Sequence, residues 1–577
     1  MADDAGSDGS GVIANRGRLL GRLAVCGWTL ALAAILLWPI TASGYLLGHD
    51  MVFTPRQPLD LASIGVSSAS PRAVPLDALV ALAERVVDGA VVGRIALLVP
   101  VLAAGLGAAA LLGTRSLPAR LAAAGVAVWN PYVVERLALG QWALLWCYAA
   151  LPWIVLSVAR VRGRVRWPAR GVAIAAASIT PTGGAIAFVA ALSVCLGLRR
   201  GHRETLTVAA LAFALQLPWL VPALTSTASA TSDPAGVAAF AARAEHPGGV
   251  LLSLLGGGGV WDADVVPGSR GGALAWVWLA VLVAAAAFGA PRLAGLLGGR
   301  LAGTLAGLAI VGLALAVLPS VPGGAALVRA AVAHVPGAGL LRDAQKWLLP
   351  LVLLEALLVG AAFGRVCAWC QRQWRPALAL LALALPILVL PDAAATLRPT
   401  LRPVHYPRDW HAVATAADSG DALVLPFSSY RTYPWAPGRT SVLDPAPRLL
   451  HVPTVVQDRL AVSGTLLTGE DPRAAAVGRL LGSGADLASG LRALGVRWVV
   501  LEQDTPGRVP ALDELTPVHA GAHVALFRVP GWVEGPEPAA WRVVAVVTGD
   551  VLALLALAAA VGAGVLAKLR KRGRALL

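Results

Sequence analysis

Long runs of apolar residues recur along this 577-residue chain and limit what it can fold into. A helix needs about 20 apolar residues to cross a bilayer, and a soluble core cannot bury many helices of that kind. The composition agrees, since 57% of the residues are hydrophobic and 14% are charged, whereas soluble domains carry about 25% charged residues. The sequence therefore predicts a polytopic α-helical membrane protein.

The apolar runs give about twelve candidate membrane spans of helical length. Their centres fall near residues 32, 101, 125, 150, 176, 191, 214, 281, 309, 356, 384 and 554. The runs near 125, 176 and 191 are short. A Thr-Pro-Thr-Gly-Gly segment at 180–184 separates the last two, which indicates broken or re-entrant helices at that point.

Basic residues gather in the short connectors between these runs and give the chain a net charge of +15. Examples are the arginines at 16–22, 160–170 and 199–203, and the basic residues at 568–574. Such connectors remain in the cytoplasm, next to anionic headgroups. We therefore predict a multi-pass protein of the plasma membrane with both termini cytoplasmic. No fold signature of a nucleic-acid-binding protein accompanies the charge, so we expect no nucleic-acid partner.

This topology divides the chain into five parts. They are a disordered cytoplasmic tail (1–18), a transmembrane core (19–391), an extracytoplasmic α/β domain (392–538), a final span (539–567) and a basic cytoplasmic tail (568–577). The α/β assignment rests on strand-like runs at 422–426, 496–501 and 524–529 and on helical patterns at 407–417 and 473–494. The polar residues at 428–433 suit a sugar ring, but we interpret them as ordinary domain surface.

An amphipathic helix is expected near residues 76–87 in the first outer loop, since Leu76, Leu79 and Val80 share one face and Asp77 and Glu84 the other. It either lies on the membrane surface or packs on the outer domain as an ordinary loop helix.

Asp50 follows the first span directly and is the first candidate functional residue. A carboxylate at the outer mouth of a helix bundle can remove a proton from a sugar hydroxyl. It can also hold a divalent cation, Mg²⁺ or Mn²⁺, against a phosphate. The alternative is a solvated loop residue without a role.

A second constellation comprises Glu135, Arg136 and Gln141, which follow the helix-ending pair Asn130-Pro131. Charges in so short an outer turn, between apolar neighbours, require a partner or a ligand. A ligand site and an internal Glu–Arg ion pair both satisfy this requirement.

Two further segments carry charge near span ends. The loop at 240–270 holds Glu245, Trp261 and Arg270 around four consecutive glycines, which allow close backbone approach to a ligand or simply flexibility. Arg342 and Lys346 stand four residues apart, and on an α-helix they would share a face suited to phosphate. The alternative is anchoring to lipid headgroups.

The five cysteines lie in apolar runs or at their cytoplasmic ends, so a disulfide framework is not expected. Cys367 and Cys370 form a lone CxxC without nearby histidines. We therefore assign no metal site.

Three stretches resemble a known group of proteins: NPYVVERLALGQWALL, FAARAEHPGGVLLSLLGGGGVWDADVVPGSR and LLRDAQKWLLPL. They are similar to the core of actinobacterial α-(1→3)-arabinofuranosyltransferases of the GT-C superfamily. The outer domain resembles that of YfhO-like membrane proteins. Many members carry paired acidic residues in the first loop, whereas here His49 precedes Asp50.

The resemblance implies an inverting glycosyltransferase of cell-wall biogenesis. It would move arabinofuranose or mannose from a polyprenyl-phosphate donor to a cell-envelope glycan, with Asp50 as general base on the extracytoplasmic face. The residues implied at the donor phosphate are Arg270, Arg342 and Lys346, and those implied in the substrate cleft are His49, Glu135, Arg136, Gln141, Glu245, Trp261 and Asp343. The alternative is a non-catalytic protein that binds or transports lipid-linked envelope glycans.

Overall fold

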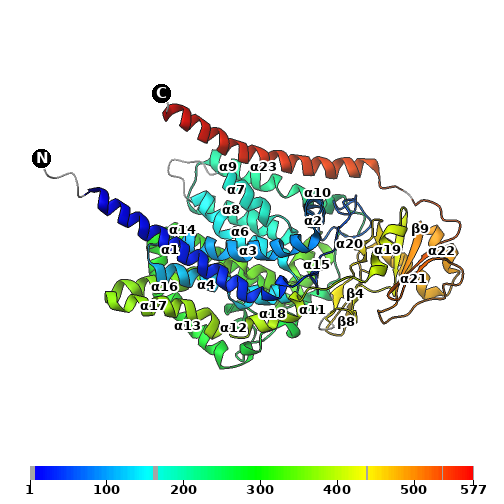
Figure 1. Ribbon diagram of the computed structural model, residues 1–577, viewed down its shortest axis with the longest axis horizontal. Coiled ribbons are helices and arrows are strands. Elements are labelled where there is room, and N and C mark those ends of the chain that lie inside the picture. Colours follow the sequence, from blue (N-terminus) through cyan, green and yellow to red (C-terminus); the bar gives the residue numbers. More distant parts are fainter. Residues whose placement is uncertain (1–6, 160–166, 437–439, 536, 576–577) are drawn as a thin grey trace.

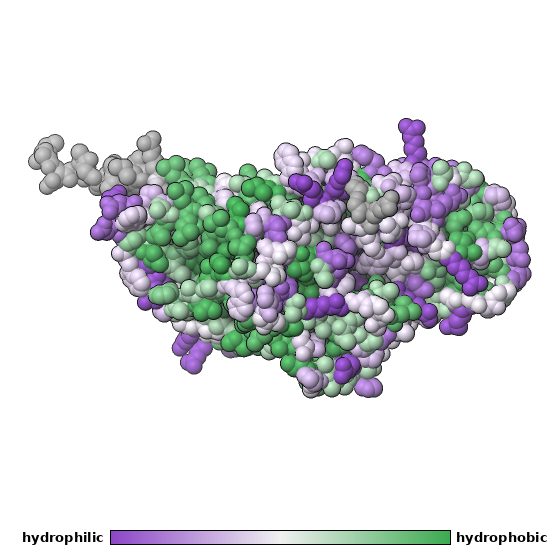
Figure 2. All heavy atoms as spheres, turned by 90° about the horizontal axis from the view of Figure 1, so that it is seen from below, coloured by the Kyte–Doolittle hydropathy of each residue, from purple (hydrophilic) through white to green (hydrophobic). Residues whose placement is uncertain are grey.

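The computed structural model describes residues 7–159, 167–436, 440–535 and 537–575. It consists of a long helical body with a sheet-containing domain at one end, while the two chain termini lie together at the other end (Figure 1). Apolar side chains cover much of the helical body, and polar ones become frequent toward the sheet-containing end (Figure 2). This division is that of a membrane-embedded part and a solvated part.

Eight helices in the described residues are long and apolar enough to span a membrane. They are α1 (Ser7–Leu36), α3 (Gly89–Leu112), α6 (Trp142–Ala159), α13 (Ala273–Leu297), α14 (Gly299–Val317), α16 (Leu349–Trp369), α17 (Arg375–Val389) and α23 (Ala540–Ala575). A ninth candidate is the pair α9 (His202–Ala214) and α10 (Leu217–Thr225), which bends by 56°. These nine coincide with nine of the twelve predicted centres.

The other three predicted centres, near 125, 176 and 191, fall in shorter helices. These are α4 (Leu117–Val128), α7 (Trp167–Ala177) and α8 (Pro181–Gly197). Helix α8 begins as the Thr-Pro pair suggests, because the Thr180 side chain accepts a hydrogen bond from the Gly183 amide and Pro181 occupies the first turn. Helix α4 is buried between α1, α3, α16 and α17. The apolar composition of α4 reflects its burial between other helices. The length of an apolar run does not distinguish a helix buried in protein from one buried in lipid.

The predicted tail 1–18 and the basic connectors are only partly described. Helix α1 already begins at Ser7, so residues 7–18 belong to this helix in the structure. A helix that a span has nucleated extends at little cost into flanking residues. Residues 1–6 and the arginine-rich connector 160–166 lie outside the described residues. The predicted basic tail from 568 continues α23 as far as Ala575.

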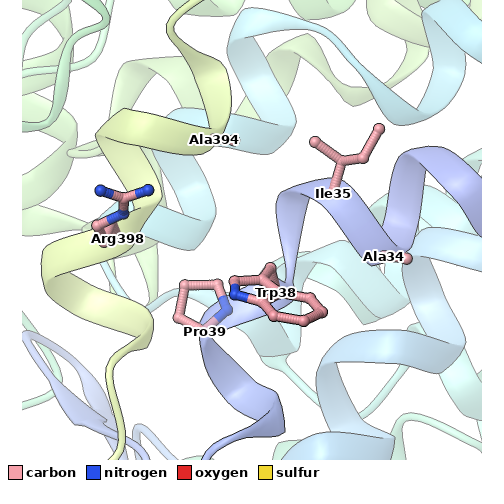
Figure 3. Close-up of a pocket in the computed structure, with 6 residues that line it drawn as sticks. All are labelled: Ala34, Ile35, Trp38, Pro39, Ala394 and Arg398. Carbon is pink, nitrogen blue, oxygen red and sulfur yellow. The ribbon is translucent and has the colours of Figure 1, made fainter.

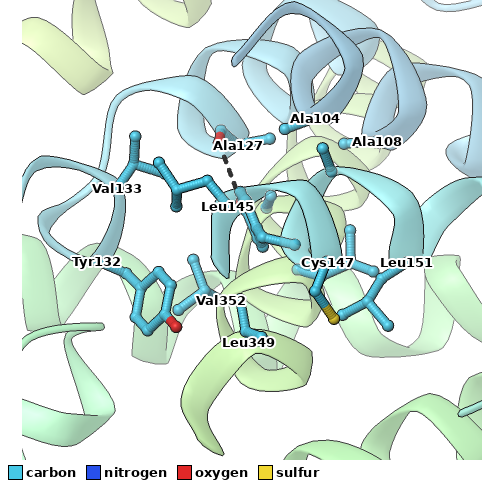
Figure 4. Close-up of a cluster of buried hydrophobic side chains, with 14 of the residues drawn as sticks. Ala104, Ala108, Ala127, Tyr132, Val133, Leu145, Cys147, Leu151, Leu349 and Val352 are labelled. Atoms are coloured by element: carbon cyan, nitrogen blue, oxygen red, sulfur yellow. Dashed lines mark hydrogen bonds between the residues drawn. The ribbon is translucent and has the colours of Figure 1, made fainter. Parts of the chain in front are cut away.

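Small residues let the central helices pack closely. Helix α5 (Pro131–Ala138) packs against side chains of α3, α4, α6 and α16. Its residues Tyr132 and Val133 lie against Leu145 and Val352 (Figure 4). At the contact of α16 with α4, a side chain at Gly360 would come within 2.7 Å of Ala123. Glycine at this position therefore sets the separation of the two helices.

The outer domain is α/β, as predicted. Its five-stranded sheet has the order β10-β11-β9-β3-β6, with β3 parallel to β6 and β9 and the remaining pairs antiparallel. The strands are β3 (Asp421–Leu425), β6 (Thr454–Val455), β9 (Val496–Glu502), β10 (Thr516–Ala520) and β11 (Val524–Arg528). Alternate residues of β3 enter two hydrophobic cores, one on each face of the sheet. The covering helices are α19 (Arg408–Ala416), α20 (Ala446–Leu449), α21 (Pro472–Ser483) and α22 (Leu487–Ala493).

Short elements connect the two parts. The strand pairs are β1 (Leu47–Gly48) with β2 (Met51–Val52), β4 (Tyr430–Arg431) with β5 (Val442–Leu443), and β7 (Leu460–Val462) with β8 (Thr465–Leu467). The short helices are α2 (Leu76–Ala83), α11 (Gly236–Ala239), α12 (Val250–Leu255), α15 (Pro322–His334) and α18 (Ala393–Leu401). The 3-10 turns are η1 (Trp38–Thr41), η2 (Ala263–Val265), η3 (Gly268–Gly271), η4 (Leu318–Ser320), η5 (Ala338–Leu341), η6 (Ala344–Leu348) and η7 (Arg372–Trp374).

Helix α2 packs on the outer domain, which is one of the two alternatives expected for the first outer loop. Asp77 pairs with Arg448 of that domain at 3.1 Å. Leu79 and Leu82 remain exposed on the other side. Contact of these two side chains with the membrane surface stays a prediction.

Arg431 provides a test of the outer domain. Its guanidinium is fully buried and lies 2.7 Å from Asp444 and 2.8 Å from Glu502. Replacing Arg431 with Met leaves two buried carboxyls without their cation, which should cost the domain roughly 3–5 kcal/mol. Thermal unfolding of the full chain, followed by tryptophan fluorescence, measures the loss.

Arg459→Met is the matched control, because Arg459 is exposed and forms no salt bridge with any described residue. Its effect should stay within about 0.5 kcal/mol. Equal melting of the two variants would contradict the role given to Arg431.

Candidate functional site

Asp50 lies in the two-residue turn between β1 and β2, and it contacts β4 of the outer domain through Tyr430. His49 has a positive φ of 49°, and the Asp50 amide donates to the Leu139 carbonyl at 3.2 Å. Gly140 adopts φ 73°, and a side chain there would collide with the backbone of Gly48 and Met51. The turn is therefore fixed against the segment that leads from α5 into α6.

Two side chains hold the Asp50 carboxylate. Gln141 Nε2 donates to one oxygen at 2.9 Å, and the Tyr430 hydroxyl donates to the other. Tyr430 belongs to β4 of the outer domain, and burial together with Asp50 raises the pKa of this tyrosine well above its ordinary value. It therefore remains a hydrogen-bond donor. Asp50 is half-buried and does not point into bulk solvent.

The contacts continue from Gln141 to the loop that precedes α16. Gln141 Oε1 accepts from Arg136 at 2.5 Å. The fully buried Arg136 guanidinium donates to both oxygens of Asp343, at 2.8 and 2.9 Å. Lys346 Nζ lies 3.5 Å from the same carboxylate. We call these six residues the Asp50 network: Tyr430, Asp50, Gln141, Arg136, Asp343 and Lys346.

Local sequence explains how Arg136 reaches this position. Asn130 caps α5 by accepting a hydrogen bond from the Val133 amide at 3.0 Å, and Pro131 occupies the first turn. Burial alone would raise the pKa of Asp343, but Arg136 and Lys346 outweigh burial and bring it to about 2. Asp343 therefore stays ionised, and the bidentate pair fixes the loop.

Lys346 is the network's accessible cation, because 29% of its side-chain surface is exposed while Arg136 is covered completely. Arg342 and Lys346 do not share an α-helical face as predicted. Both flank Asp343, whose extended backbone separates the 3-10 turns η5 and η6. Arg342 instead lies toward the outer domain, 3.9 Å from Glu470.

Glu135, Glu245 and Arg270 form a separate buried group. Glu245 accepts from the Gly259 amide at 2.5 Å and from Arg270 at 3.4 Å, and Glu135 accepts from Gln345. Burial raises the pKa of Glu135, and repulsion by Glu245 raises it further. One oxygen of Glu135 and one of Glu245 accept no hydrogen bond from another described residue. Glu355 of α16 is buried near the same glycine-rich loop.

The two remaining predicted residues lie at the contact with the outer domain. The His49 carbonyl accepts from the Leu443 amide at 2.8 Å. Trp261 packs edge-on against Phe240 at 5.1 Å, beside the β7–β8 hairpin. The described residues contain no group of three or more His, Cys, Asp or Glu that could hold a metal ion.

Sequence reasoning missed Tyr430 and Glu355. Tyr430 stood in the polar segment 428–433, which we interpreted as ordinary surface, although its hydroxyl contacts Asp50. Its separation of 380 residues from Asp50 explains why no local pattern indicates the contact. Glu355 had a usable signal, since a carboxyl inside an apolar span calls for an explanation.

No protein-family model and no curated protein matches the chain. Two solved structures of the archaeal oligosaccharyltransferase from Archaeoglobus fulgidus are similar to it at low identity. One, AglB in complex with an inhibitory peptide and a dolichol-phosphate, has 11% identity and a TM-score of 0.42, with 84% of this chain and 69% of that chain covered. The other, tethered to an acceptor peptide, has 12% identity and a TM-score of 0.41, with 84% and 68% covered.

The buried acid pair gives a pH-dependent prediction. The pKa of Glu135 is raised in the folded protein, so its contribution to stability is complete below the unfolded pKa of about 4.5 and is lost as pH rises through the folded value. Glu135→Gln should therefore stabilise the protein by roughly 1–3 kcal/mol at pH 8. The gain should disappear near pH 4.5. Melting temperatures across this range measure it.

Glu534→Gln serves as the control, because Glu534 is exposed in the outer domain. It should leave the pH dependence of melting unchanged. A gain for Glu135→Gln that is equal at both ends of the pH range would refute the assignment.

Proposed function

We propose that this protein is a membrane glycosyltransferase of the GT-C type that uses a polyprenyl-phosphate sugar and an acceptor glycan of the cell envelope. The single observation that supports this most is the Asp50 network. It connects a half-buried carboxylate, through Gln141, Arg136 and Asp343, to the solvent-accessible Lys346. A base and a cation held in one framework are what displacement of a sugar from a phosphate requires.

In this proposal Asp50 takes the proton of the acceptor hydroxyl. The hydroxyl oxygen then forms a bond to the anomeric carbon while the bond from that carbon to the phosphate oxygen breaks. A single displacement of this kind inverts the configuration. The departing phosphate carries the electron pair away, and a nearby cation lowers the energy of that charge.

Among the predicted phosphate ligands, Lys346 is the best suited. Its side chain is partly exposed, and among the described residues its ammonium pairs with Asp343. Arg270 is buried against Glu245, so we assign it a structural role. Arg342 faces Glu470 of the outer domain and is a second candidate at the rim. Arabinofuranose and mannose are the proposed sugars.

Replacement of Asp50 tests the base. Asp50→Asn keeps the side chain's size and can still accept from Gln141, but it cannot remove a proton. Turnover of polyprenyl-phosphate arabinofuranose or mannose in membrane vesicles should fall by about 10²–10⁴-fold. Asp264→Asn, at an exposed carboxylate on the same side of the membrane, should leave turnover unchanged.

Near-normal turnover by Asp50→Asn would remove its catalytic role. Binding of the donor by the wild-type chain without any product would instead favour the alternative of a non-catalytic binding or transport protein for lipid-linked glycans.

Replacement of Lys346 tests the phosphate site. Lys346→Met removes a charge-assisted contact, and transfer efficiency (kcat/KM) for the donor should fall by roughly 10–100-fold. Arg342→Met should have a smaller effect, since Arg342 already faces Glu470. A larger loss of kcat/KM in Arg342→Met than in Lys346→Met would assign the main phosphate contact to Arg342.

A further inference from the structure

An apolar groove opens on the outside of the helical body, where α1 turns into η1 and passes α18. Its volume is about 380 Å³. One wall of the groove is formed by Ile35, Trp38 and Pro39, and Arg398 lies across from it on α18 (Figure 3). The complete lining is Ala34, Ile35, Trp38, Pro39, Ala394 and Arg398. The groove is separate from the Asp50 network.

The groove lies at the end of the first candidate span, where lipid headgroups are expected. This span ends at Leu36, two residues before Trp38, and tryptophan is enriched at membrane–water interfaces. Its side chain is 70% exposed, and Ile35 is 47% exposed one turn deeper. The apolar side chain of Ile35 and the indole ring of Trp38 together form a wall that fits a lipid acyl chain.

Arg398 is the one charged residue in this lining. It is exposed, and no described residue forms a hydrogen bond or ion pair with its side chain. The nearest acid along the chain, Asp392, is held by the amide and hydroxyl of Ser269. The neighbouring Arg94 donates to the carbonyls of Ile40 and Ala42. The mouth of the groove therefore carries uncompensated positive charge, which an anionic headgroup complements.

Helix α18 separates the groove from Asp50. Its opposite face carries Thr400, which donates to the Ala138 carbonyl at 2.9 Å and packs against Gly48. A phosphate at Arg398 would lie on the other side of this helix from Asp50. The groove is therefore poorly placed for a donor whose phosphate must be displaced at the Asp50 network.

We propose that this groove binds a bilayer phospholipid with an anionic headgroup. The acyl chain lies against Ile35, Trp38 and Ala394, and the phosphate pairs with Arg398. Arg398 can form paired hydrogen bonds to phosphate oxygens, which distinguishes a lipid site from general attraction to a charged surface. The inference is independent of the glycosyl-transfer proposal.

Lipid retention tests it. The full-length protein is reconstituted in vesicles with equal amounts of phosphatidylcholine and phosphatidylglycerol and is then extracted in mild detergent. Native mass spectrometry counts the lipids that remain. Wild type should retain phosphatidylglycerol in preference to phosphatidylcholine, and Arg398→Gln should lower that preference by roughly tenfold or more.

Two further variants complete the test. Ala394→Trp fills the groove without removing the charge, so retention of both lipids should fall. Arg329→Gln changes an exposed arginine of α15 away from the groove and should behave as wild type. Unchanged lipid retention in Arg398→Gln or in Ala394→Trp would overturn the proposal. Retention of polyprenyl phosphate in place of phospholipid would also overturn it.

Discussion

The buried pair of Arg136 and Asp343 is the interaction on which the rest of this site depends. Two charges taken out of water are tolerated only where each satisfies the other, and here two parallel hydrogen bonds do so. The pair brings together two segments that stand 207 residues apart in the chain. Arg136 also holds Gln141, and Gln141 holds Asp50. The position of Asp50 is thus set by a contact that Asp50 does not make itself.

The second buried group is built differently. Glu135 and Glu355 both interact with Arg270, which also pairs with Glu245, so three carboxyls share this guanidinium. The glycine-rich loop supplies backbone donors, of which the Gly259 amide is one. We interpret this group as the support that holds the long loop against α5 and α16. This group is buried, whereas Asp50 is half-exposed. We use this difference to distinguish a structural group from one that contacts a ligand.

Much of this arrangement follows from local patterns. Long apolar runs located nine of the helical segments, and short strand-like runs located the central strands of the outer sheet. The other three predicted spans fall in shorter helices, and α4, one of them, is apolar and buried between other helices. Candidate residues were recognised as charges in apolar surroundings, but their pairing was not. Arg342 and Lys346 show why, since Asp343 interrupts the helix that their spacing suggested. Contacts such as that of Tyr430 with Asp50 depend on tertiary packing. The local periodicity of a single sequence does not predict such contacts.

The contact between Tyr430 and Asp50 bears on how the protein matures. Ribosomes deliver the first loop early, whereas β4 emerges only after α17 has been made. Until that late strand has folded against the first loop, the carboxylate lacks one of its two donors. A nascent or prematurely terminated chain would thus hold an incomplete Asp50 network, and the network would be completed together with the outer domain.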